Sequence, residues 1–141
     1  MDVLFLIGRL LFVAVFIASA LTVHLIGFRQ GVEYARAYNA PAPELGVLAT
    51  GVAALVGGLM VALGVWADLG ALLLVAFLLV ITPIMHAFWK ETDPQMRATQ
   101  NAMFLKNFAL IGGALVVFYL YNQLQGDAGL SITDPLFGRA D

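Results

Sequence analysis

The side chains in this sequence that could do chemistry are few, and most of them stand at the ends of long apolar stretches. The candidates for binding a ligand or a partner are His24, Tyr38, His86, Trp89, Lys106 and Asn107. Imidazole, phenol, ammonium and amide groups donate hydrogen bonds to carbonyl oxygens, and imidazole also binds haem iron. The sequence has no cysteine, which excludes disulfides, thiol redox chemistry and thiolate metal sites. We therefore expect a binding site without a metal. The sequence identifies no catalytic residue in it.

A second polar group consists of Arg9 and Asp68, which lie within or beside apolar stretches. A charge in lipid is costly unless it is paired or reaches water. We expect Arg9 to face the bundle or the aqueous boundary and to pair with Asp68, as a structural charge within the membrane. The alternative is that Arg9 contacts a ligand or another subunit.

Four stretches without Asp, Glu, Lys or Arg must position these groups. They are Leu10–Phe28, Leu45–Ala67, Leu69–Trp89 and Phe108–Gln125. A helix that crosses a bilayer needs about 20 apolar residues, and the hydrophobic content of 62% exceeds the range of about 45–50% in soluble domains. The fold class that we predict is an all-α, polytopic membrane protein with a four-transmembrane-helix bundle. A single domain covers residues 1–141, with spans at about 3–28, 45–67, 69–89 and 104–124 and a polar surface tail at 126–141.

The connections between the spans differ in length. Spans two and three are joined only around Asp68, so they form an antiparallel hairpin. We expect the loop Arg29–Glu44 to hold a short interfacial helix that ends in an extended turn at Pro41 and Pro43. The third connection, Lys90–Asn101, is expected to be a polar loop. The first span lacks a basic leader and a small-x-small cleavage site, so we expect it to remain in the mature protein.

The basic residues predict the orientation in the membrane. Loops one and three hold Arg29, Arg36, Lys90, Arg97 and Lys106, whereas the other side offers Arg9 and Arg139. The positive-inside rule therefore places both loops in the cytoplasm and both termini outside. We expect the protein to be integral to a cell membrane, inner or plasma, of a bacterium. The net charge of −2 gives no reason to expect a nucleic-acid partner.

Small residues spaced four apart indicate where helices approach closely. The strongest stripe is Ala54, Gly58 and Ala62 in span two, near Gly51. Weaker stripes are Ala14, Ala18 and Thr22 in span one and Ala109 with Gly113 in span four. We interpret them as contacts within the bundle, and a dimer face is the alternative.

The topology brings the candidate site residues to one membrane level, at the end that carries loops one and three. Pro83 removes a backbone hydrogen bond near the end of span three and predicts a kink beside His86. We expect His86, Lys106 and Asn107 to converge with the turn between Tyr38 and Pro43. The structural alternatives are an aromatic belt for Tyr38 and Trp89, a loop carbonyl as the partner of His24, and a Lys106 that reaches lipid phosphate.

Several motifs resemble the DoxX family of small four-helix membrane proteins. They are the run from Met85 to Trp89, the run from Phe104 to Gly113, Gly8-Arg9, Tyr38 with Pro41 and Pro43, and Gly57-Gly58 with Gly64. Many members carry a glutamate three residues before the paired glycines, where this chain has Ala54. The resemblance implies four helices and an association with redox enzymes, since the family is named for the small subunit of a thiosulfate:quinone oxidoreductase.

Three functions follow from these observations. The favoured one is a noncatalytic subunit or membrane anchor of a larger redox or respiratory assembly, which binds protein partners and needs no cofactor. The alternative is a quinone-binding oxidoreductase subunit, in which His86, Lys106, Asn107 and Tyr38 hold the head group. The least favoured is a b-type haem protein with His24 and His86 as axial ligands.

Overall fold

The computed structural model of this chain describes residues 2–124 and 129–137, and these residues form helices and no strands. In chain order the elements are α1 (Asp2–Ser19), the π-helix η1 (Ala20–Ile26), α2 (Phe28–Ala37), α3 (Pro43–Leu63), α4 (Ala67–Met85), the 3₁₀-helix η2 (Phe88–Lys90) and α5 (Pro94–Leu124). Four segments are long and apolar enough to cross a membrane, namely Asp2–Ile26, Pro43–Leu63, Ala67–Lys90 and Pro94–Leu124. The prediction of an all-α membrane protein with four spans is confirmed.

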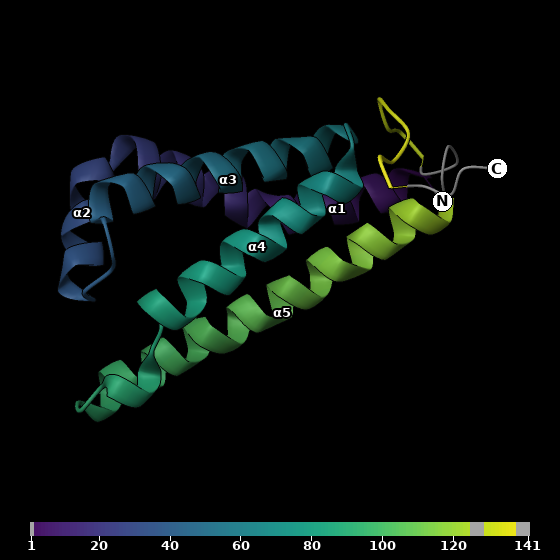
Figure 1. The fold of residues 1–141 in the computed structure, drawn as a ribbon. Coiled ribbons are helices and arrows are strands. Elements are labelled where there is room, and N and C mark those ends of the chain that lie inside the picture. Colours follow the sequence, from purple (N-terminus) through teal and green to yellow (C-terminus); the bar gives the residue numbers. More distant parts are fainter. Residues whose placement is uncertain (1, 125–128, 138–141) are drawn as a thin grey trace.

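The α3–α4 hairpin forms the centre of the bundle. Helix α1 packs against α3, α5 packs against α4, and α1 meets α5 over a short stretch only. Figure 1 shows that α1 and α3 diverge from α4 and α5 toward the end of the molecule that carries α2. The hairpin turn requires Gly64, because this residue ends α3 in the left-handed region at φ 66° and a Cβ there would lie 2.6 Å from the Ser131 hydroxyl. The bundle is therefore closed near its termini and open at the α2 end.

Glycines let α3 approach helices on two sides. A Cβ at Gly58 would meet Ile17 of α1 at 3.0 Å, and one at Gly57 would lie 3.0 Å from both the Gly70 carbonyl and the Leu74 side chain of α4. Ala54 is fully buried beside them. The stripe predicted in span two therefore packs within the bundle.

The two weaker stripes do not pack fully within the bundle. Ala14, Ala18 and Thr22 are exposed, so the prediction for span one is wrong. The buried face of α1 carries Val13 and Phe16 instead, because these larger side chains fill the space beside the small residues of α3. In span four a Cβ at Gly113 would meet the Phe12 ring at 2.9 Å, but Ala109 is exposed.

The segment that we predicted to lie at the interface forms helix α2, whose buried side carries Val32 and Ala35 while Arg29 and Arg36 are exposed. The extended turn that we predicted after it is shorter than expected. Pro43 already stands in the first turn of α3, and Ala42 before it adopts a left-handed φ of 45°. Proline suits this position because its missing N–H would have no partner in the helix.

The third connection is also shorter than predicted. Helix α5 begins at Pro94, so most of the predicted loop Lys90–Asn101 is helical. The Asp93 carboxylate accepts a hydrogen bond from the Met96 backbone N–H at 2.7 Å and caps the helix, with Pro94 directly after it. Apolar content alone missed this start because the first turns of α5 are polar. As a consequence, Gln95, Arg97 and Gln100 project from a helix.

Candidate functional site

A cleft of about 640 Å³ lies where the two halves of the bundle diverge. Its walls come from the end of α1 and η1, from α2, from the first half of α3 and from the last turns of α4. Aliphatic and small residues dominate the lining, among them Val23, Val47, Val80, Ile81 and Ile84. The cleft is open on one side, and its size lies within the range of about 300–1,000 Å³ that is typical of ligand pockets.

His24 lines this cleft from η1. Its Nδ1 is 2.7 Å from the Val47 carbonyl oxygen of α3, so the partner is a helix carbonyl where we expected a loop carbonyl. The segment Ala20–Ile26 is wound as a π-helix, a geometry that often occurs at functional sites. The wider winding changes which side of the segment faces α3. Neither the π-helix nor its effect on His24 could be anticipated from hydropathy.

The His24 side chain fits against α3 because residue 51 is glycine. A Cβ at Gly51 would lie 2.4 Å from the His24 Cβ and 2.8 Å from its Cγ. These contacts are shorter than real Cβ atoms tolerate, so any larger residue would displace the imidazole or the helix. Gly51 therefore determines the position of a cleft residue, besides serving helix packing.

His86, the residue that follows α4, lines the same cleft. Its Nδ1 is 2.8 Å from the Gln100 Oε1 of α5. The Gln100 amide donates to the Tyr38 hydroxyl at 2.6 Å and to the Tyr34 hydroxyl at 3.1 Å. These four residues form a polar network that connects α4 and α5 with α2. Gln100 is buried, so the network ties the two halves of the bundle together at the open end.

Tyr38 stands just after α2, outside the membrane-spanning segments. Burial raises the pKa of this phenol to about 12, and the neighbouring Tyr34 and Glu91 add to the effect, while the hydrogen bond from Gln100 opposes it. The Tyr34 and Tyr38 rings pack with their centroids 4.8 Å apart. Tyr38 is therefore a neutral hydroxyl at physiological pH, which suits its place beside the Gln100 amide.

Asn107 is buried between α4 and α5, where its amide donates to the Thr82 hydroxyl at 3.1 Å. Lys106 is exposed, and its ammonium contacts the Met103 sulfur at 3.7 Å. Neither residue lines the cleft. The expected convergence of Lys106 with His86 does not occur, because adjacent residues on a helix point in directions about 100° apart. Only one of them can face α4.

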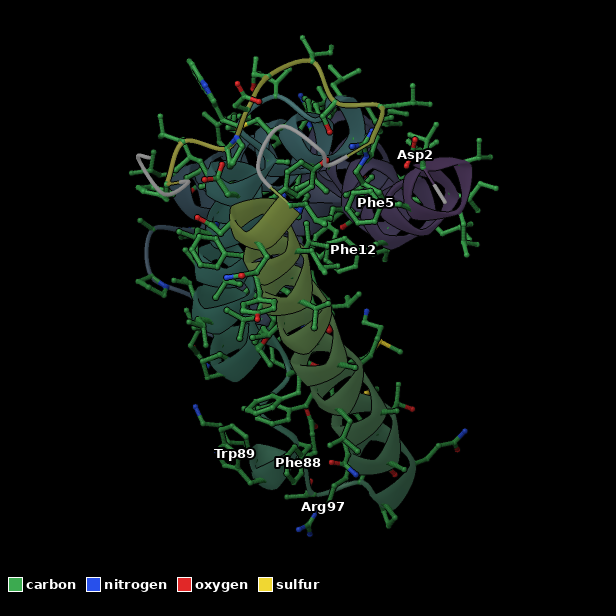
Figure 2. The ribbon with its side chains drawn as sticks, turned by 90° about the vertical axis from the view of Figure 1, so that its right-hand side faces the viewer. Asp2, Phe5, Phe12, Phe88, Trp89 and Arg97 are labelled. Carbon is green, nitrogen blue, oxygen red and sulfur yellow. The ribbon has the colours of Figure 1, made fainter. Side chains whose placement is uncertain are left out.

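Trp89 also lies outside the cleft. Half of its surface is exposed, and its ring packs against Phe88 and Phe104 at centroid distances of 5.2 and 5.7 Å. Figure 2 shows Phe88 and Trp89 near Arg97, at the end of the molecule far from Phe5 and Phe12. This arrangement is typical of an aromatic belt at a membrane interface.

Sequence reasoning missed two site residues, Tyr34 and Gln100. A signal for Gln100 was available, since buried residues on α5 recur every seven positions at Gln100, Asn107, Ala114 and Tyr121. Residues with this spacing share one face of a helix. Because Pro94 marks the helix start, the face that contains Asn107 can be extended back to Gln100.

Arg9 and Asp68 lie at the opposite end of the bundle, and both are buried. The expected ion pair between them does not form. The Arg9 guanidinium donates to the Tyr121 hydroxyl, to the Ser131 hydroxyl at 3.0 Å and to the Leu130 carbonyl at 2.7 Å. The Asp68 carboxylate accepts the Phe137 N–H at 2.7 Å. Each charge is thus held by segment 129–137, whose position neither hydropathy nor motif spacing predicted.

Segment 129–137 is attached to the bundle by further hydrogen bonds. The Gly64 carbonyl accepts from the backbone N–H groups of Ile132 and Thr133, and the Thr133 hydroxyl accepts from the Trp66 N–H. The predicted surface tail is therefore packed on the bundle over these residues. Residues 126–128 and 138–141, with Arg139, lie outside the described part of the chain.

Comparisons with known proteins agree with the resemblance noted in the sequence. The sequence model of the DoxX family matches residues 4–87, which include all but the first two residues of α1, all of α2 to α4 and both histidines. No curated protein and no solved structure matches the chain. The matched region contains all the walls of the cleft but excludes α5 and the Gln100 side chain.

Proposed function

This chain belongs to the DoxX family, and we propose that it is a noncatalytic membrane subunit of a larger redox assembly that holds a quinone-type lipid in its cleft. A quinone-type lipid has a flat ring with two oxygens and an apolar chain. The proposal joins the anchor and quinone interpretations, because a subunit can position a quinone without transferring electrons itself.

The cleft is the observation that carries this proposal. It combines aliphatic walls with two imidazoles, from His24 and His86, and it is open on one side. Ligand sites typically pair such an apolar lining with a few polar groups that orient the ligand. The cleft lies at the end of the spans, where the ring of a membrane quinone could reach polar groups while its chain stays in lipid.

The composition supports a noncatalytic role. Without cysteine, the chain cannot use thiol pairs to exchange electrons with a quinone. Electrons would then come from a partner subunit or its cofactor. The exposed charges of α2 and of the start of α5, including Arg29, Arg36 and Arg97, offer a surface for such a partner on the cleft side.

The orientation completes the proposal. We place the α2 end in the cytoplasm and the ends of the chain outside a bacterial cell membrane, since the basic residues of loops one and three favour that arrangement. Cysteines introduced singly at Arg29 and at Asp2, labelled from outside intact cells with a membrane-impermeant maleimide, test it. Labelling is expected at residue 2 only, and labelling at residue 29 only would reverse the orientation.

The binding experiment uses the full chain purified in mild detergent. We expect extracted lipids to contain a quinone, and the redox partner to co-purify. His24→Ala and His86→Ala should lower retention of the quinone-type lipid, counted as the sum of its oxidised and reduced forms, whereas Lys106→Ala, outside the cleft, should not. Equal retention by all variants would refute the site. A Soret band lost in both histidine variants would instead assign the two imidazoles to haem b.

A further inference from the structure

We infer that the cleft selects the reduced, hydroxyl-bearing form of a quinone-type ring, a quinol, over the oxidised quinone. The inference rests on the proposed function, in that a quinone-type ring is taken as the ligand. It depends on which hydrogen bonds the lining of the cleft can donate and which it can accept. A quinone carries two carbonyl acceptors, whereas a quinol carries two O–H donors.

His24 can offer the cleft only an acceptor when the ring is neutral. A carbonyl oxygen cannot donate, so the 2.7 Å contact with Val47 requires the proton of His24 to be on Nδ1. The second nitrogen, Nε2, then carries a lone pair. No hydrogen-bond partner of His24 Nε2 lies among residues 2–124 and 129–137. The backbone of α3 therefore selects the tautomer of this residue.

His86 is held in the same tautomer by a side chain. The Gln100 NH₂ group donates to the Tyr34 and Tyr38 hydroxyls, which leaves its Oε1 to accept from His86 Nδ1. His86 Nε2 is then also an acceptor, and within the described residues it has no partner. Gln100 is thus a positioning residue, since it does not line the cleft but determines what His86 offers there.

The other polar groups of the lining do not reverse this preference. The hydroxyl protons of Thr22 and Thr50 are engaged with the carbonyls of Ala18 and Gly46. Ser19, Gln30 and Tyr34 carry groups that can both donate and accept. The described lining contains no Lys, Arg or Trp, the side chains that can only donate. The two imidazoles can therefore only accept, whereas Ser19, Gln30 and Tyr34 can take either role.

A quinol offers a donor for each imidazole, because its two hydroxyls stand at opposite ends of the ring and His24 and His86 come from different walls. A quinone has no hydrogen to donate to either Nε2 atom, so each imidazole would lose a hydrogen bond to water without gaining one from the ligand. Sites that hydrogen-bond a substrate hydroxyl discriminate strongly against analogues without it. Loss of one such bond lowers affinity by about tenfold. We therefore expect quinol to bind at least about tenfold more tightly than quinone.

The direct test compares three small probes under anaerobic conditions. Tetramethyl-1,4-hydroquinone, its oxidised benzoquinone and its dimethyl ether share one carbon skeleton, and the ether has no O–H donor. Their dissociation constants for the protein in nanodiscs near neutral pH should rank hydroquinone well below the other two. If the quinone or the ether binds as tightly as the hydroquinone, the inference is wrong but the proposed function stands. If none of the probes binds and no quinone co-purifies, both fail.

Nitrogen-15 NMR of labelled histidine gives a measurement that does not depend on a variant. Both His24 and His86 should show a protonated Nδ1 and an unprotonated Nε2, and only the hydroquinone should shift the Nε2 signals. Detection of a protonated Nε2 on both rings in the free protein would overturn the inference.

Gln100→Leu tests the positioning role. This change removes the acceptor of the His86 Nδ1 proton, so the ring can present Nε2–H instead. The hydroquinone-to-quinone affinity ratio should fall about tenfold while quinone binding is retained. Gln95→Leu, the same change at an exposed position of α5, is the matched control and should keep the ratio. A folded Gln100→Leu protein with an unchanged ratio would refute the role of Gln100.

Discussion

Replacing Gly51 by alanine should disrupt the cleft through a single methyl group. The new Cβ would lie 2.4 Å from the His24 Cβ, whereas ordinary contacts begin at 3.4 Å, so the two backbones must separate by about 1 Å. Overpacking of this kind costs about 1–3 kcal/mol. Loss of the hydrogen bond between His24 and Val47 adds about 1 kcal/mol, and the higher helix propensity of alanine returns about 1 kcal/mol. We expect a net loss of about 1–3 kcal/mol in the free energy of unfolding.

The assay is denaturation of the purified protein in detergent micelles, followed by circular dichroism. Gly112→Ala is the matched control, because that glycine also lies inside a spanning helix but no neighbouring atom lies within 4 Å of the place that a Cβ would occupy. Gly112→Ala should be neutral or slightly stabilising. If Gly51→Ala is as stable as Gly112→Ala and binds the hydroquinone probe equally well, the contact between His24 and α3 does not determine the cleft.

Three further predictions concern other parts of the molecule. Arg9→Met should speed amide hydrogen exchange at Ile132 and Thr133 at least about tenfold, because segment 129–137 loses the hydrogen bonds that Arg9 donates. Arg29→Met, at an exposed site, should leave the exchange unchanged, and equal exchange in the two variants would refute the attachment of segment 129–137 by Arg9. Because the pKa of Tyr38 is raised to about 12 from 10.0, the folded protein keeps a proton that the unfolded chain releases, so the contribution of Tyr38 to stability is constant below pH 10 and is lost as the pH rises toward 12. Tyr38→Phe should flatten this decline in stability, and an unchanged slope would contradict the assignment. A double-mutant cycle of Thr82→Val and Asn107→Leu should give a coupling free energy of about 0.6 kcal/mol, as is typical of hydrogen bonds between membrane helices, and zero coupling would mean that the bond does not contribute.

Hydropathy was sufficient to predict four spans, because a bilayer imposes the same length and polarity on every crossing helix. It could not place the ends of the helices where polar turns extend beyond the membrane. Helix α5 starts at Pro94, several turns before its apolar part, and the capping residue Asp93 was a better signal than composition. The packing of segment 129–137 was equally hidden, since it depends on contacts with Arg9 and Asp68 that are distant in the sequence.

The candidate site was predicted in part. His24 and His86 were assigned to one membrane level, and both line the cleft. Lys106 and Trp89 were grouped with them by level alone, although they point elsewhere. The direction of a side chain depends on the rotation of its helix, which small changes in winding alter. The π-helix around His24 is such a change.

Helix α5 links the two ends of the bundle through one buried face. Gln100 and Asn107 occupy its cleft end, Tyr121 contacts Arg9 near the other end, and Ala114 between them lets the helix lie close to α4. Since α1 touches α5 only briefly, the bond between Arg9 and Tyr121 is a main connection between these two helices. The network of His86, Gln100, Tyr34 and Tyr38 joins the two halves of the bundle beside the cleft, while the other end is held by Arg9 and segment 129–137. We therefore expect the width of the cleft to be governed at the end of the molecule that carries α2.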